Sequence, residues 1–147
     1  ILGTHALDLA SWLAGQPLTP VAASRWPESG IDRAADLLLQ GPASSGGLLV
    51  HVFVSVELRS ASRVSVIGPA GELEALGTLG AHGGGAVLFR PPRGEPEALP
   101  FLGIDPYEVQ LRAFLRAVRD GHEPEAGGEA GARNVEWLDR LGPARPA

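Results

Sequence analysis

The sequence predicts an α+β fold in which a mainly antiparallel, open β-sheet has helices packed on one face. Three observations predict it: an amphipathic segment at the start, a run of short apolar segments separated by tight turns, and two amphipathic segments at the end. Strands joined in this way pair antiparallel, and flanking helices cover one side of their sheet. The valine-rich central strand makes a solvated second face unfavourable, so a partner subunit or a second domain is expected there.

The first helix is predicted over residues 4–14. Thr4 would be its N-cap and Gly15 its C-terminal stop. Pro17 and Pro20 come next, and neither can continue a helix because proline has no backbone N–H to donate.

Strands are predicted in the middle of the chain, where apolar and β-branched residues alternate with turn residues. The segments are 21–26, 34–40, 48–58, 63–67, 72–76 and 86–90, with 98–101 as an edge strand. The segment 48–58 is the strongest, since it is dense in Val, Leu and Phe. The turn at 68–71 should join its two neighbouring strands as a hairpin.

A second helix is predicted from 106 to Gly121, because Asp105 can cap it, Pro106 fits its first position and Glu108 its third. Its apolar stripe consists of Tyr107, Leu111, Phe114, Leu115 and Val118. A closing helix is predicted over 129–141, and the residues expected to be buried on it are Val135, Leu138 and Leu141. Trp26 and Trp137 are interpreted as core residues.

Composition excludes several classes of function. A length of 147 residues fits one domain, predicted over 1–147. A net charge of -5 argues against a nucleic-acid or anionic-membrane partner, and no apolar run reaches the roughly 20 residues of a membrane span. There is no cysteine for a disulfide or thiolate metal site, and the absence of lysine excludes a Schiff base. We expect a cytoplasmic protein.

The first helix carries the candidate site. His5, Asp8 and Trp12 are three and four residues apart, so a helix places them on one stripe. An imidazole beside a carboxylate could move a proton on a small polar ligand near neutral pH. The alternative is that His5 only caps or packs at a helix end and that Asp8 favours the positive end of the helix dipole. Spacing alone favours the alternative.

Other polar features are interpreted as structural. His51 is expected to be a satisfied sheet or interface histidine, and His82 and His122 to be solvated. No pair among the four histidines has metal-ligand spacing, so no metal site is predicted. The segment 80–85 is rich in glycine but lacks the G-x-G-x-x-G spacing of a phosphate loop. The row formed by Arg112, Arg116 and Arg119 is expected to be a solvated helix surface.

The segment from Gly3 to Gly15, with His5, Asp8 and Trp12 in it, resembles the Gly-x-His-x-x-Asp…Trp-Leu-x-Gly opening of the C-terminal domain of Gfo/Idh/MocA-type oxidoreductases. Later segments fall in the same order: the hairpin 66–73, the helix from 106 to Pro124 and a closing helix. Together they cover nearly the whole chain. Many members carry a further Asp four residues before the His, where this chain has Ile1.

The resemblance implies a glyceraldehyde-3-phosphate dehydrogenase-like substrate-binding and oligomerisation domain. It implies an enzyme that transfers a hydride between NAD or NADP and a sugar, a polyol or a related hydroxy compound. His5 matches the catalytic His, Asp8 matches a substrate-binding Asp, and Trp12 could border the substrate. A separate N-terminal Rossmann domain, carrying a Glu-Lys-Pro motif, would bind most of the cofactor, since this chain has no dinucleotide fingerprint.

Two further expectations concern the chain itself. As the C-terminal part of such an enzyme, it should be inactive alone, bind NAD(P) weakly at best, and form a homo-oligomer through its sheet face. The alternative is a non-catalytic dimerisation or ligand-binding module of the same fold, and Ile1 in place of the acidic residue is its main support.

Overall fold

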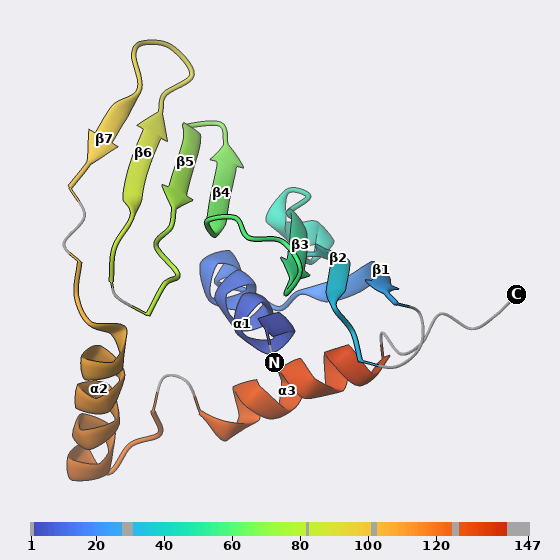
Figure 1. Cartoon of the computed structure of the whole chain (residues 1–147), viewed down its shortest axis with the longest axis vertical. Coiled ribbons are helices and arrows are strands. Elements are labelled where there is room, and N and C mark those ends of the chain that lie inside the picture. Colours follow the sequence, from blue (N-terminus) through green and yellow to red (C-terminus); the bar gives the residue numbers. More distant parts are fainter. Residues whose placement is uncertain (1, 28–30, 82, 101–102, 125–126, 141–147) are drawn as a thin grey trace, which may run out of the picture. The chain divides into compact units, whose positions relative to one another are not determined.

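The computed structural model describes residues 2–27, 31–81, 83–100, 103–124 and 127–140. Its contacts divide the chain into two compact units, one of Ile1–Arg59 with Ala126–Ala147 and one of Ser60–Glu125. Figure 1 shows the elements in chain order. Within the described ranges, no helix is long and apolar enough to cross a membrane.

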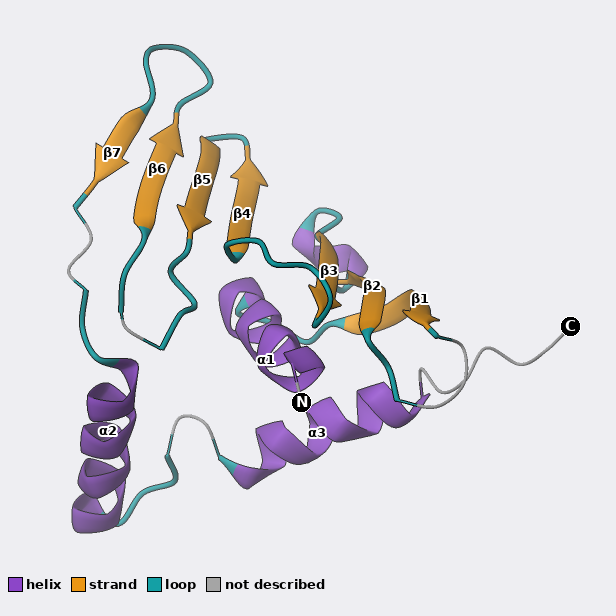
Figure 2. Ribbon diagram, in the orientation of Figure 1, coloured by secondary structure: helices purple, strands orange, loops and turns teal. Residues whose placement is uncertain are grey.

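Among the described residues, the first unit comprises helices α1 and α3 and a three-stranded sheet; Figure 2 distinguishes its helices and strands by colour. Its elements are α1 (Leu2–Ala14), β1 (Thr19–Trp26), β2 (Ala34–Gln40), the 3-10 turn η1 (Ala43–Ser45), β3 (Leu49–Ser55) and α3 (Gly128–Arg140). The strands pair antiparallel in the order β1-β2-β3. Strand β3 is shorter than predicted because the Ser55 hydroxyl accepts hydrogen bonds from the backbone N–H groups of Glu57 and Leu58, which turns the chain away.

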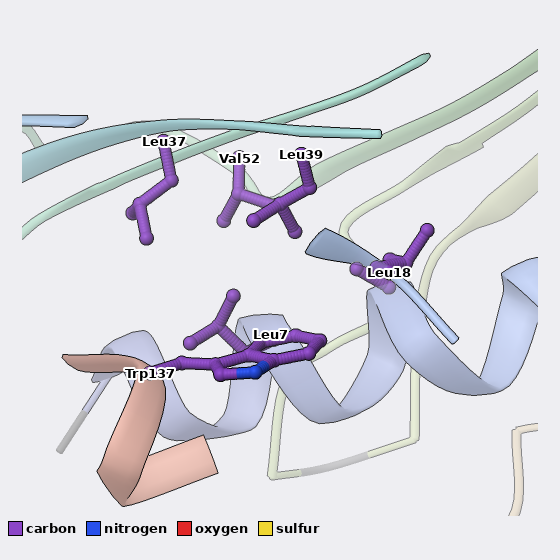
Figure 3. Packing of buried hydrophobic residues seen from close by; sticks show 7 residues of the cluster. Leu7, Leu18, Leu37, Leu39, Val52 and Trp137 are labelled. Carbon is purple, nitrogen blue, oxygen red and sulfur yellow. The ribbon is translucent and has the colours of Figure 1, made fainter. Parts of the chain in front are cut away.

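Helices α1 and α3 cover one face of this sheet, as predicted. Leu37 and Leu39 of β2 point from the sheet towards Leu7 of α1 and Trp137 of α3, and Val52 of β3 lies beside them (Figure 3). Leu7 and Leu39 are completely buried. Trp137 is therefore a core residue, as the sequence predicts.

Two details of the helices differ from the prediction. Helix α1 begins at Leu2, so Thr4 lies inside its first turns and is not an N-cap. On α3, Val135 is 51% exposed, whereas Asn134 and Trp137 are buried and Leu138 is partly buried. These three share the stripe at i, i+3 and i+4, and Val135 lies about 100° away from Asn134 around the helix. Leu141, also predicted to be buried, lies outside the described residues.

The described part of the second unit consists of a four-stranded antiparallel sheet and helix α2. Its elements are β4 (Arg63–Gly68), β5 (Gly71–Leu76), β6 (Ala86–Arg90), β7 (Glu97–Leu99) and α2 (Pro106–Asp120). The predicted α+β fold is confirmed, and the strands are divided between two sheets. The hairpin β4–β5 closes where Gly68 pairs with Gly71, at the predicted turn.

One face of the second sheet is organised by a buried acid. The side chain of Glu74 on β5 lies between Arg63 and Arg90, with N–O distances of 3.2 and 2.7 Å. The positive charges of the two arginines neutralise the buried carboxylate, and both arginines remain in contact with solvent.

Helix α2 has the ends that the sequence predicts. The Asp105 carboxylate accepts hydrogen bonds from the backbone N–H groups of Tyr107, at 2.9 Å, and Glu108. Gly121 ends the helix with a left-handed φ of 70°, which favours glycine. The apolar stripe of α2 is exposed.

Candidate functional site

Helix α1 carries the three predicted site residues. The helix is uninterrupted over Leu2–Ala14, so His5, Asp8 and Trp12 share one stripe. His5 is exposed, Asp8 is half-buried and Trp12 is 65% exposed. Because Leu7 anchors the helix in the core, the stripe is fixed at the border between core and solvent.

The side chain of Asp8 is held from the other helix. The amide nitrogen of Asn134 on α3, Nδ2, donates a hydrogen bond to Asp8 Oδ1 at 3.2 Å. Asn134 is only 4% exposed. Asn134 was not among the predicted site residues, although a signal was present: it is a polar residue on the stripe that Trp137 and Leu138 share.

The alternative explanation of Asp8, a favourable charge at the positive end of a helix, fits the structure poorly. Helix α1 begins at Leu2, so Asp8 lies beyond its first turn. The attraction of a helix terminus for charge falls off within that turn. The contact with Asn134 is therefore the interaction that accounts for the position of the carboxylate.

Chemically, the stripe offers a proton carrier and an acceptor. The His5 ring makes no hydrogen bond to a described residue, so both its nitrogens are available to a ligand. Asp8 forms no ion pair in the described ranges, and its second oxygen is available to accept from a hydroxyl group. The exposed Trp12 ring adds an apolar surface of the kind on which a sugar ring can lie.

The other histidines that the structure describes have the structural roles that the sequence predicts. His51 Nε2 lies 2.7 Å from Asp36 Oδ1 across β2 and β3. His122 is exposed and bonds through Nδ1 to the carbonyl of Glu123. His82 lies outside the described residues. The described part of the chain contains no group of three or more potential ligands that could hold a metal ion.

The predicted arginine row is a solvated helix surface with local pairs. Arg112 bonds to Glu108 one turn earlier, at 2.7 Å. Arg119 pairs with the neighbouring Asp120, and this hydrogen bond raises the pKa of the Arg119 guanidinium. Both contacts belong to the second unit, whereas the site residues belong to the first.

The outer face of the first sheet carries several large, exposed apolar side chains. Register places Trp26, Leu38, Leu49 and Phe53 on this face, together with the polar pair Asp36–His51. Trp26, Leu49 and Phe53 are each more than half exposed, so the interpretation of Trp26 as a core residue is wrong: its position in the strand turns it away from the helices. Few charged side chains and several large apolar ones are typical of the central part of an interface.

The described residues do not fit a dinucleotide cofactor by themselves. Every strand pair that the structure describes is antiparallel. A dinucleotide site of the Rossmann kind needs parallel strands joined by a helix whose N-terminus meets the pyrophosphate. Nothing in the described ranges supplies that arrangement.

Comparison with solved structures identifies the fold. The chain superposes on an aldose-aldose oxidoreductase from Caulobacter crescentus with a TM-score of 0.79 and 20% identity, covering 95% of this chain and 42% of the other. It superposes on KijD10, a 3-ketoreductase from Actinomadura kijaniata, with a TM-score of 0.78 and 18% identity, covering 95% and 44%. This is the fold of the C-terminal part of Gfo/Idh/MocA-type oxidoreductases.

The match confirms the fold that the opening motif implied, and it extends to the fold alone. No protein-family model matches the chain, and no curated protein matches it significantly. The chain spans less than half the length of the Gfo/Idh/MocA-type structures it resembles. The first of these was solved with glycerol and the second with NADP.

Proposed function

We propose that this chain is the substrate-binding and oligomerising part of an NAD(P)-dependent oxidoreductase. The full protein would transfer a hydride between the nicotinamide and a sugar, a polyol or a related hydroxy compound. The observation that carries the proposal is the His5–Asp8 stripe at the start of a fold shared with oxidoreductases. The structures with glycerol and with NADP support the substrate class and the cofactor.

The cofactor would be held mainly by an upstream Rossmann domain, because the antiparallel sheets described above do not fit it. The nicotinamide supplies the hydride chemistry when it is bound. The isolated chain is accordingly expected to be inactive.

His5 is the proposed proton carrier. When a secondary alcohol becomes a carbonyl, its hydroxyl proton needs an acceptor, and a neutral imidazole can take it near neutral pH. The exposed ring of His5, free of described partners, can approach a substrate oxygen. In the reverse direction the imidazolium returns the proton.

Asp8 and Trp12 are the proposed substrate contacts. The Asp8 oxygen that Asn134 leaves free can accept from a second hydroxyl, which fixes the substrate relative to His5. The exposed indole of Trp12 offers an apolar surface to the carbon face of the substrate. Both roles concern binding and orientation.

The apolar outer face of the first sheet is the proposed self-association surface. Phe53 on β3 is 51% exposed on this face, and replacing it by glutamate should separate the oligomer, because the substitution buries a charge at the interface. Sedimentation of the variant measures this. The control Ile67→Glu puts the same charge on an exposed residue of the second sheet. If Phe53→Glu sediments like the unchanged protein, this face is not the interface.

The alternative is a non-catalytic dimerisation or ligand-binding module of the same fold. One observation favours it: the Asn134 contact accounts for Asp8 without any substrate. A module of this kind would use the same outer sheet face and would need no proton carrier.

A dehydrogenase screen of the full-length protein tests the proposal. Sugars and polyols, glycerol among them, are offered with NAD or NADP, and reduction of the nicotinamide is followed by absorbance. His5→Ala should lower kcat about 10²–10⁴-fold, the usual contribution of a general base. His122→Ala is the matched control, since it removes an exposed histidine of the other unit. An unchanged rate in His5→Ala removes His5 from the mechanism, and inactivity of the unchanged protein on every substrate favours the module.

A further inference from the structure

Asn134 is a buried polar residue that the proposed function does not use. Its side chain lies on the face of α3 that packs against α1 and is almost completely buried. A buried amide has to find hydrogen-bond partners, because desolvating it otherwise has a high free-energy cost. Its described partner is Asp8, which stands 126 positions earlier in the chain.

Packing one turn further along α3 fixes where the amide lies. There Trp137 is buried in the core with Leu7. Leu138 of α3 packs closely against Gly3 of α1. A Cβ added at Gly3 would lie 3.4 Å from a Leu138 methyl carbon. With the helix spacing set by these apolar contacts, the amide has little freedom to follow movements of Asp8.

The chemistry of the pair determines its direction. A carboxylate only accepts hydrogen bonds, so the NH₂ end of the amide has to face it. The bond occupies Oδ1 and leaves Oδ2 without a described partner. Asparagine is neutral, so it orients the carboxylate and leaves its negative charge intact. An arginine in the same place would cancel that charge.

We propose that Asn134 is the positioning residue of the site: it holds one oxygen of Asp8 so that the other faces a substrate hydroxyl. This inference rests on the proposed function for the role of Asp8. Asn134 does not touch the substrate and acts only through Asp8. A contact that merely joined two helices would contribute to stability and leave substrate affinity unchanged.

The test compares two variants on the same helix pair. Asn134→Leu removes the donor and keeps a buried side chain of similar size. Leu138→Ala is the matched control, because it weakens the same α1–α3 packing without touching the polar contact. For each variant we would measure thermal stability, the side-chain rotamer of Asp8 by NMR coupling constants in the labelled chain, and KM and kcat of the full-length protein with the best polyol substrate.

Positioning predicts that Asp8 occupies one χ1 rotamer in the unchanged chain and in Leu138→Ala, and averages over rotamers in Asn134→Leu. It also predicts that Asn134→Leu raises KM about tenfold or more, as loss of a hydrogen bond to a charged group can, with a smaller change in kcat. A single Asp8 rotamer in Asn134→Leu overturns the inference. So does a KM equal to that of the unchanged enzyme.

An exchange variant separates stability from positioning. Asp8→Asn combined with Asn134→Asp restores an amide–carboxylate pair but moves the charge to α3. Positioning predicts that stability returns while KM stays high, and a restored KM overturns it. The two proposals fail differently: a protein that oxidises no polyol refutes the proposed function, whereas the rotamer of Asp8 in Asn134→Leu still decides whether Asn134 orients it.

Discussion

Substituting alanine for Gly71 should destabilise the second sheet strongly. Gly71 opens β5 with a φ of +127°, a conformation that side-chain-bearing residues rarely adopt. A Cβ built there would lie 2.2 Å from the backbone oxygen of Arg90 on β6. Ordinary contacts begin near 3.4 Å, so the strands would have to separate by about 1.2 Å (3.4 minus 2.2).

The expected loss combines these two costs. Backbone strain of this kind costs about 1–3 kcal/mol, and forced displacement of packed atoms costs a similar amount. We therefore expect Gly71→Ala to lower the free energy of unfolding by about 3 kcal/mol. For a chain of this length, each kcal/mol lowers Tm by about 2–4 °C, so the shift should be about 6–12 °C.

The matched control lies in the same hairpin. Gly68 pairs directly with Gly71, but its backbone is ordinary and an added Cβ would meet nothing within 4 Å. Gly68→Ala should change stability by no more than about 0.5 kcal/mol. Thermal and urea unfolding followed by circular dichroism measure both variants. If Gly71→Ala melts together with the unchanged protein, or if both variants lose the same stability, the close approach to Arg90 is not real.

Two further predictions concern the core and a helix end. Leu7→Ala should lower the free energy of unfolding in urea by about 3 kcal/mol, because the Leu7 side chain is completely buried. Leu13→Ala should lower it much less, because Leu13 is 44% exposed. Equal losses in the two variants would contradict the core described above. Asp105→Ala should lower the free energy of unfolding by about 1 kcal/mol and speed hydrogen exchange of the Tyr107 and Glu108 amides about fivefold, because it removes their N-cap acceptor. Unchanged exchange of these amides would exclude the cap.

Much of the fold could be predicted because turn residues divide this chain clearly. Strands β2 and β6 have the predicted bounds, and α2 has the predicted cap, because the local chemistry of Asp105 and Pro106 is sufficient to start a helix. The division into two sheets could not be predicted. It depends on which strands share hydrogen bonds across the chain, and apolar periodicity does not specify partners.

The candidate site was predictable only in part. The spacing of His5 and Asp8 placed them on one stripe of α1, as the structure has it. The sequence predicts burial of Val135 and gives no such prediction for Asn134, because hydrophobicity favours valine over asparagine, whereas the structure buries Asn134 and exposes Val135. The choice depends on the rotation of α3 about its axis. Trp137, the largest apolar side chain of that helix, determines this rotation by entering the core.

The first unit is assembled from two segments far apart in the sequence, with the second unit as one continuous segment between them. During synthesis the second unit can therefore fold before α3 has been made, whereas Leu7, Leu37 and Leu39 remain without Trp137 until α3 emerges. A chain that stops before α3 would contain His5 and Asp8 but would lack Asn134, which bonds to Asp8, and Trp137 of the core. The proposed site would therefore be incomplete in a partly synthesised chain and would form only after α3 has been made.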